Sequence, residues 1–151
     1  MNKLFILVCL LISFENSNAQ TPNFRWVRHY NTNASGSDVV LDPLGNLYTA
    51  GSFRGYIDFI PGGTLPVDSG GMQNIYFSKL DPAGHHIWTR ALPGIGTNDD
   101  ARAIASDLAG NLYMAGYYSS VVDFDASASV YAMGSIGNLR DIFVCKYDSS
   151  G

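Results

Sequence analysis

A nine-residue segment of this chain occurs twice, as GNLYTAGSF at residues 45–53 and as GNLYMAGYY at residues 110–118. The match extends upstream, so that residues 41–53 and 106–118 share seven identities in thirteen positions. It also extends downstream, where Asn-Ile-Tyr-Phe-Ser-Lys-Leu-Asp at 74–81 aligns with Asp-Ile-Phe-Val-Cys-Lys-Tyr-Asp at 141–148. An internal repeat constrains a fold more strongly than any local propensity. The chain is therefore predicted to contain two similar structural units in tandem.

The motif Asp-x-x-Gly punctuates both copies, each time directly after an apolar run. Its four occurrences are residues 42–45, 81–84, 107–110 and 148–151. An Asp side chain accepts a hydrogen bond from the backbone N–H two residues on, and Gly adopts the left-handed conformation. These segments are predicted to be hairpin turns. A calcium site is the alternative, but one carboxylate per turn is far from the six to eight oxygens that calcium requires.

Short strands are predicted between these turns. Their expected ranges are 39–41 and 101–106, 46–52 and 111–117, 75–80 and 142–147, and 86–92. About twenty residues between the second and third strands predict one more short strand and a loop. Apolar residues stand at consecutive positions, as in Ile75-Tyr76-Phe77, which indicates cover on both faces of each sheet. The pattern favours small antiparallel sheets stacked face to face.

The order of these motifs resembles the SBBP family, a β-propeller repeat of secreted bacterial proteins. The resemblance rests on Asp-x-x-Gly-Asn-Leu-Tyr-x-Ala-Gly, then Asp-Phe, then Ile-Phe/Tyr-x-x-Lys-x-Asp-x-x-Gly, then Trp. It implies an all-β fold of antiparallel four-stranded propeller blades, exported by a Gram-negative cell and often carried to its surface. The family often reads Asp-Phe-Asp-Pro-Gly after the second strand, and residues 58–62 and 123–127 each keep only part of that motif.

The repeat divides the chain into four expected parts. They are a signal peptide at 1–19, a leading strand at 20–36, a first propeller repeat at 37–93 and a truncated second repeat at 94–151. Trp26 aligns with Trp88, so residues 24–29 are predicted to be a strand. That strand is expected to pack as an isolated edge or to pair with residues 142–147. Two blades cannot close a ring that typically needs about four to eight, so the chain is expected to be the beginning of a longer protein.

The first nineteen residues are typical of a secretory signal peptide. Lys3 precedes an apolar run over residues 4–14, and Ser17-Asn18-Ala19 predicts cleavage before Gln20. A membrane anchor is the alternative, but the run is shorter than the roughly 20 apolar residues that span a bilayer. Cys9 would leave with the signal, and Cys145 would then have no disulfide partner. Cys145 is predicted to be a small buried hydrophobe rather than a catalytic thiol, because no His lies near it in sequence.

Composition and motifs argue against several functions. Nine basic and thirteen acidic residues give a net charge of −4 without any basic cluster, which disfavours nucleic acid as a partner. No GxSxG, HExxH, CxxC or phosphate-binding loop occurs. The metal-ligand candidates are His85-His86, Asn98-Asp99-Asp100, Asp58, Asp123 and Asp125. We predict that the histidines lie on the polar surface of a strand and that residues 98–100 are a solvated turn. The repeated aspartate at 58 and 123 is predicted to bond backbone N–H groups in the adjoining turn; no metal or cofactor is expected.

Aromatic side chains give one further candidate, a sugar-stacking platform. Its members would be Tyr48, Tyr113, Tyr117, Tyr118, Trp26 and Trp88. Packing between sheets is the competing interpretation. The sequence as a whole predicts a non-catalytic binding or display scaffold, secreted or at the cell surface, whose partner is an unknown protein or glycan. The alternative is the substrate- or carbohydrate-binding part of an extracellular hydrolase or lyase with catalytic residues beyond residue 151.

Overall fold

The protein is all-β and antiparallel, as the sequence predicts. The computed structural model describes residues 22–30, 33–58, 66–95 and 98–151. Its strands are β1 (Asn33–Leu41), β2 (Leu47–Asp58), β3 (Pro66–Leu80), β4 (His86–Leu92), β5 (Asp100–Ser106), β6 (Leu112–Ser119), β7 (Val121–Asp123), β8 (Ala132–Gly134) and β9 (Arg140–Tyr147). One short 3₁₀ turn, Ile136–Asn138, precedes β9.

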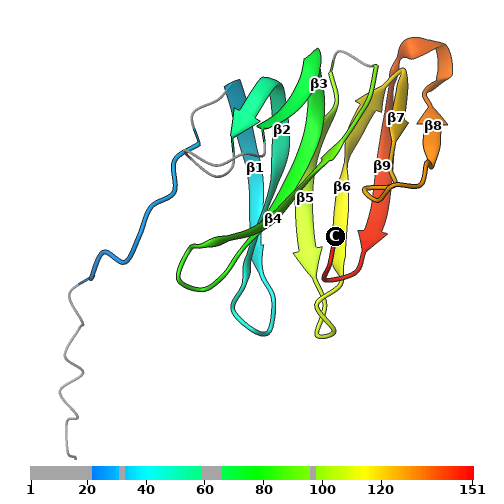
Figure 1. Cartoon of the computed structure of the whole chain (residues 1–151). Helices are drawn as coiled ribbons and strands as arrows, with labels where there is room; N and C mark the ends of the chain where they lie inside the picture. Colours follow the sequence, from blue (N-terminus) through cyan, green and yellow to red (C-terminus); the bar gives the residue numbers. More distant parts are fainter. Residues whose placement is uncertain (1–21, 31–32, 59–65, 96–97) are drawn as a thin grey trace, which may run out of the picture.

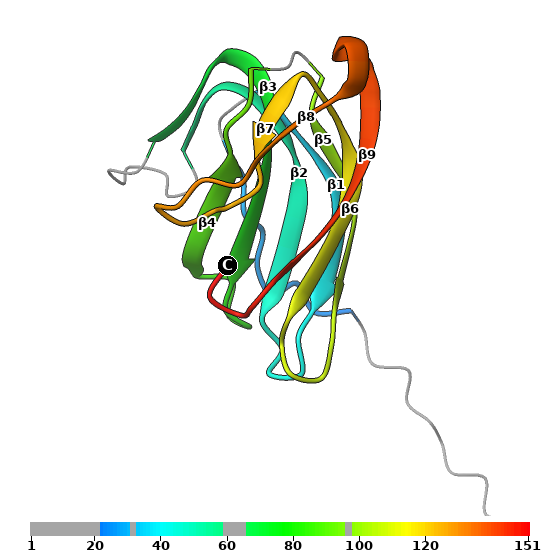
Figure 2. The same cartoon turned by 90° about the vertical axis from the view of Figure 1, so that its right-hand side faces the viewer.

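The strands form two main sheets and a small one. The first sheet has the order β1-β2-β3-β4, and the second sheet has the order β5-β6-β9. In the sequence, the small two-stranded sheet β7-β8 lies between β6 and β9, which pair directly with each other. Figure 1 shows the two main sheets side by side, and Figure 2 shows the same arrangement from the side, with β5 lying against β1 and β2.

The first two strands of each sheet share a register shift at the same aligned position. The β1–β2 ladder shifts register after Gly36, and the β5–β6 ladder shifts after Ala101, at the aligned position. Gly51 and Gly116 lie opposite these bulges. A Cβ atom on them would approach a backbone oxygen of the neighbouring strand to 1.9 Å and 2.1 Å. Only glycine permits this close approach of two backbones, which explains why both repeats read Ala-Gly here.

Three Asp-x-x-Gly segments, at 42–45, 81–84 and 107–110, join paired antiparallel strands and are hairpin turns, as predicted. The Oδ1 atom of Asp42 accepts hydrogen bonds from the N–H groups of Leu44 and Asn46, both at 2.9 Å. Asp107 accepts the equivalent pair in the second repeat, also at 2.9 Å. Gly45 has a φ of 80°, the left-handed conformation that the turn requires.

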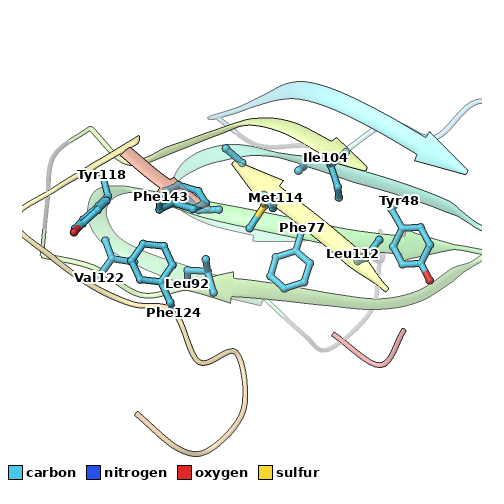
Figure 3. Close-up of a cluster of buried hydrophobic side chains, with 13 residues drawn as sticks. Tyr48, Phe77, Leu92, Ile104, Leu112, Met114, Tyr118, Val122, Phe124 and Phe143 are labelled. Carbon is cyan, nitrogen blue, oxygen red and sulfur yellow. The ribbon is translucent and has the colours of Figure 1, made fainter. Parts of the chain in front are cut away.

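The core lies between the facing surfaces of the two sheets (Figure 3). It consists of Tyr48, Ala50, Ile75, Phe77, Leu92, Ala101, Ile104, Leu112, Met114, Tyr118, Val122, Phe124 and Phe143. Phe77 is central, because its ring lies 5.6 Å from that of Trp88 and 4.7 Å from that of Tyr147, measured between centroids. Aromatic side chains therefore join the sheets, and stacked sheets bury apolar surface in this way.

Two predictions about strands need correction. In the first sheet, β2 and β3 form one long hairpin as far as the pair Asp58 and Pro66, so the described part of the stretch predicted to hold a separate strand belongs to these two strands. Residues 59–65 lie outside the described part. The predicted additional strand exists in the second repeat as β7. The extended ladder in the first repeat follows from pairing between two neighbouring strands, which single-strand patterns do not reveal.

The predicted strand at residues 24–29 is also wrong. Residues 22–30 have no strand assignment and do not pair with β9. A strand must pair with the free edge of another strand. In the first sheet, β3 offers no free edge to residues 22–30, because β2 and β4 occupy its two sides. The segment instead lies against the first sheet through its side chains.

Candidate functional site: the groove along β9

A groove of about 580 Å³ follows the outer edge of β9. It is lined by Phe124, Asp125, Tyr131, Met133 and residues 142–147. β9 pairs with β6 on one side, and no strand in the described ranges pairs with its other side. An unpaired edge presents a row of backbone N–H and C=O groups that can bind another strand.

The face of β9 that points away from the core is apolar and exposed. Ile142 is 86% exposed, whereas the aligned Ile75 on β3 is fully buried. Val144 lies two positions further along the same face and is also exposed. An exposed apolar patch beside an open strand edge is typical of an interaction surface.

The opposite rim of the groove is the loop that joins β7 to β8. Asp123 accepts hydrogen bonds from the N–H groups of Asp125 and Tyr131, at 3.0 Å and 2.8 Å. The predicted structural role of Asp123 is therefore confirmed. The hydroxyl of Tyr147 on β9 donates to the carbonyl of Phe124 at 2.9 Å, which fixes the rim to the strand. For Asp58, the adjoining residues 59–65 lie outside the described part of the chain.

The titratable groups of the groove favour binding over reaction. Burial raises the pKa of the Cys145 thiol to about 11, so this thiol is neutral near pH 7 and a poor nucleophile. Hydrogen bonds from Ser127 lower the pKa of Asp125, which is therefore ionised. The Lys146 ammonium lies 5.1 Å from the centre of the Tyr113 ring. The groove thus offers one negative and one positive group around an apolar floor.

Cys145 is half-buried rather than buried as predicted. The aligned residue in the first sheet, Ser78, is fully buried, and β4 runs beside it with Thr89 opposite. Among the described residues, no strand equivalent to β4 lies beside β9. The thiol is therefore more exposed than the Ser78 side chain.

A Trp-x-Arg segment joins the two sheets at their outer edge. Trp88 on β4 packs on Gly151 in the last turn of the second sheet. Arg90 donates from Nε to the carbonyl of Gly151 and from Nη2 to that of Ser150, both at 3.3 Å. We call this arrangement the Trp–Arg contact.

The same contact occurs a second time, one unit earlier. Trp26 packs on Gly84, and its Nε1 donates to the carbonyl of Pro82 at 3.3 Å. Arg28 donates from Nε to the carbonyl of Gly84. Tyr30 packs beside Phe53, Ile57 and Tyr76, on the face of the first sheet that points away from the second. Residues 26–30 therefore lie on the first sheet as residues 88–92 of β4 lie on the second.

Glycine is required at both turns of the Trp–Arg contact. Gly84 and Gly151 each have a φ of 82°. A Cβ atom would lie 2.6 Å from the Trp26 indole at the first position and 2.8 Å from the Trp88 indole at the second. Sequence reasoning aligned the tryptophans but missed the contact. The joint recurrence of Trp-x-Arg and Asp-x-x-Gly was the signal that could have revealed it.

The two adjacent histidines do not converge on one site. His85 Nδ1 lies 2.8 Å from Asp81 Oδ2, and His86 Nε2 lies 2.9 Å from the hydroxyl of Thr89. Each imidazole is thus held by its own neighbour. Within the described ranges, no group of three or more His, Cys, Asp or Glu side chains is arranged to hold a metal ion.

The acidic pair at the start of β5 is buried, so the prediction of solvated turn acids at residues 98–100 is wrong for Asp99 and Asp100. Asp99 is fully buried and accepts a hydrogen bond from the N–H of Ser119 at 2.8 Å, while its Oδ2 has no partner. Burial raises the pKa of Asp99. Asp100 forms an ion pair with Arg102 at 3.1 Å and accepts from the hydroxyl of Ser37 at 3.3 Å. Both residues tie the connection between the repeats to the second sheet or to β1.

The six aromatic candidates do not form one platform. Tyr48 and Tyr118 are buried in the core. Tyr117 lies between two guanidinium groups, those of Arg102 and Arg140, at 5.1 Å and 4.3 Å from its ring centre. Trp88 packs against Tyr48 with 5.9 Å between ring centroids. Their positions favour packing between sheets over stacking on a sugar.

No helix in the described part of the chain has the length and apolar character to cross a membrane. Comparison with known proteins gives no match to a family model, to a curated protein or to a solved structure.

Proposed function

We propose that this chain is an exported β-propeller repeat protein of the SBBP type that acts as a non-catalytic binding or display scaffold outside the cell or at its surface. The supporting observation is the recurrence of the Trp–Arg contact. Residues 26–28 hold the first sheet as residues 88–90 hold the second. A contact that recurs from one unit to the next generates a regular array, and a propeller is such an array around an axis.

The use of the repeated polar side chains supports a non-catalytic role. Asp42 accepts hydrogen bonds from two backbone N–H groups, from the side-chain amide of Asn46 and from the hydroxyl of Tyr48. Asp107 accepts the same set from its own repeat. These carboxylates hold turns, and the β9 groove supplies the recognition surface. Its partner would be a protein or a glycan that meets an apolar floor and a polar rim.

Export is tested by fusing residues 1–22 to a phosphatase that is active only after translocation. We expect activity outside the cytoplasm and a mature N-terminus at Gln20, because the apolar run over residues 4–14 is typical of a signal peptide. Leu7→Arg interrupts that run and serves as the control that should abolish export. An inactive fusion would contradict the exported scaffold.

Binding is tested by presenting the purified chain to an array of glycans and to immobilised surface extracts of the producing cell. Val144→Lys, in the groove, should abolish any specific signal, whereas Leu108→Lys, at a fully exposed turn tip, should preserve it. Signals that survive Val144→Lys would exclude the β9 groove as the binding surface.

A further inference from the structure

We propose that a polar hollow at one end of the first sheet binds a small hydroxy-carboxylate, such as a single sugar acid. The hollow has a volume of about 330 Å³ and is lined by residues of β1, β2 and β3. This volume is near the lower end of the range of about 300–1,000 Å³ that small-molecule sites occupy. The inference goes beyond the proposed function, because it involves neither export nor the β9 groove.

The register of the first sheet places five polar residues of the hollow on one face. Asn33, Arg54 and Gln73 form one row across β1, β2 and β3. Ser35 and Ser52 are paired in the next row, two residues along each strand. Side chains that lie two residues apart on a strand, or directly opposite each other on neighbouring strands, point to the same side of a sheet. The five side chains therefore converge on one surface.

The hollow lies where the first sheet meets the connection to the second sheet. Ser52 lies opposite Ile75, which belongs to the core between the two sheets. Gln73 donates from Nε2 to the hydroxyl of Ser52 and to the carbonyl of Asp99, both at 3.2 Å. The hollow therefore belongs to the junction between the two described repeats.

The hollow has a local positive charge, although the protein as a whole has a net charge of −4. Arg54 carries this charge and is exposed, and none of the other described residues that line the hollow is ionisable. A guanidinium group is planar and forms two parallel hydrogen bonds to a carboxylate. The charge therefore favours a ligand with an anionic group that is placed against Arg54.

The neutral side chains of the hollow favour a ligand that also carries hydroxyl groups. Asn33 and Gln73 have amide groups, whereas Ser35 and Ser52 have hydroxyl groups, so all four both donate and accept hydrogen bonds. An inorganic anion such as sulfate only accepts, and it would leave the acceptor atoms of the hollow without a donor. A hydroxy-carboxylate supplies both the anion and the donors.

The same place in the second sheet is occupied by larger side chains. Tyr117 is aligned with Ser52, and Arg140 is aligned with Gln73. The Arg140 guanidinium lies 4.3 Å from the centre of the Tyr117 ring, so these two side chains contact each other. The repeat can therefore fold with this place filled, and the hollow is a property of the first repeat alone.

Titration of the ¹⁵N-labelled protein with sodium glucuronate, followed by NMR, tests the proposal. Glucuronate has about 13 non-hydrogen atoms, and a ligand of this size should bind with a Kd on the order of 1 mM. We expect the amide signals of residues 33–35, 52–54 and 73 to shift. Glucose lacks the carboxylate, whereas acetate and sulfate lack the hydroxyl groups, so each should bind at least about tenfold more weakly. Equal binding of any of the three, or shifts confined to other residues, would overturn the proposal.

Two substitutions test the role of charge in the hollow, each with a matched control. Arg54→Gln removes the cation from the hollow, whereas Arg25→Gln removes an exposed cation outside it. Ser35→Asp introduces the carboxylate that the second repeat has at the aligned Asp100, whereas Ser35→Asn is neutral. Arg54→Gln and Ser35→Asp should each raise the Kd for glucuronate at least about tenfold, and the controls should change it less than about threefold.

Circular dichroism checks that each of these variants keeps its β structure. An unchanged Kd in Arg54→Gln or in Ser35→Asp would overturn the proposal. An equal loss of affinity in Arg25→Gln would also overturn it, because general charge attraction would then explain the binding.

The hollow can be tested separately from the β9 groove, because the two share no lining residue. A ligand with a millimolar Kd dissociates too fast to be retained on a washed array, so the glycan-array result concerns the groove alone. Val144→Lys should leave the glucuronate titration unchanged. A loss of glucuronate binding in Val144→Lys would contradict the placement of this site in the first sheet.

Discussion

β3 and β9 occupy equivalent places in the two repeats, yet one of them is buried and the other is open. Phe77 on β3 is 1% exposed, and the aligned Val144 on β9 is 77% exposed. On the opposite faces the difference disappears, since Tyr76 is 5% and Phe143 is 7% exposed. Both of those faces meet a neighbouring layer, formed by Tyr30 in one case and by the first sheet in the other. Burial in this molecule is therefore decided by the neighbouring unit more than by the strand's own sequence.

Truncation of an aligned pair of residues should give the largest difference between the two strands. Phe77→Ala removes a ring from the centre of the core and should cost about 3–5 kcal/mol of unfolding free energy. Val144→Ala should cost less than about 0.5 kcal/mol in the monomer, because its side chain has almost no neighbours to lose. Urea unfolding at low protein concentration measures both values. Similar losses at the two positions would show that the second sheet is covered on both faces.

Alanine at two left-handed glycines tests the Trp–Arg contact. Gly84 and Gly55 have φ values of 82° and 75°, so Ala should cost about 1–2 kcal/mol at either position. A Cβ atom on Gly84 meets the Trp26 indole, whereas one on Gly55 meets nothing within 4 Å. Gly84→Ala should therefore cost about 1 kcal/mol more and should alter tryptophan fluorescence. If Gly55→Ala changes the fluorescence as much, the contact at Gly84 has no special role.

Substitution of the repeated turn aspartates tests whether the difference in burial between the two repeats also affects stability. Asp42 is buried and has Lys79 Nζ at 3.7 Å from its Oδ2. Asp42→Asn should therefore cost about 1.5–3 kcal/mol. Asp107 is more exposed, so Asp107→Asn should cost less. Equal losses from urea unfolding would contradict the difference in burial.

Acid should lower the stability of the folded protein, because the same two aspartates become protonated. For Asp42, burial raises the pKa, but hydrogen bonds from Asn46, Leu44 and Tyr48 outweigh it, so the net pKa is lowered. For Asp107, the amide of Asn111 is the main cause of a lowered pKa. A lowered folded pKa stabilises the fold above the unfolded value of about 3.9, and this stabilisation is lost as the pH falls through the folded pKa. Melting temperatures should drop below about pH 4, less steeply in Asp42→Asn; an unchanged slope in that variant would contradict the assignment.

Asp99 should give the smallest effect and the opposite sign. Its pKa is raised by burial, so its ionised form opposes folding above the folded pKa. Asp99→Asn should stabilise the protein at pH 7 by less than about 1 kcal/mol and should lose this advantage as the pH falls below the folded pKa. Asp148→Asn, in an exposed turn, is the control that should not stabilise. A loss of stability in Asp99→Asn at pH 7 would mean that the charge is needed.

Local chemistry made the turns and strand centres predictable. Asp42 and Gly45 specify their turn within four residues, and β4 begins and ends at the predicted His86 and Leu92. The β2–β3 extension and the failure of residues 24–29 to form a strand depend on which partner edges are free. A single sequence does not encode that information in any one segment.

The candidate site was harder to predict than the fold. The sequence suggested His85, the acidic pairs and the aromatic residues as site candidates. In the structure, His85 contacts Asp81, Asp99 accepts a hydrogen bond from Ser119, and Trp88 packs on Tyr48. The β9 groove lies along a strand edge with which no described strand pairs. Ile142 on this strand is the same residue type as the aligned, buried Ile75. Only the three-dimensional arrangement distinguishes the two.

Amide hydrogen exchange of β3 and β9 tests the central claim most directly, because protection depends on the neighbours of each strand. The account predicts that the amides of β3, which lies between β2 and β4, are protected, whereas the outward-facing amides of residues 142–146 in β9 exchange rapidly. Equal protection of the two strands would contradict the claim that neighbouring layers decide burial in the two repeats.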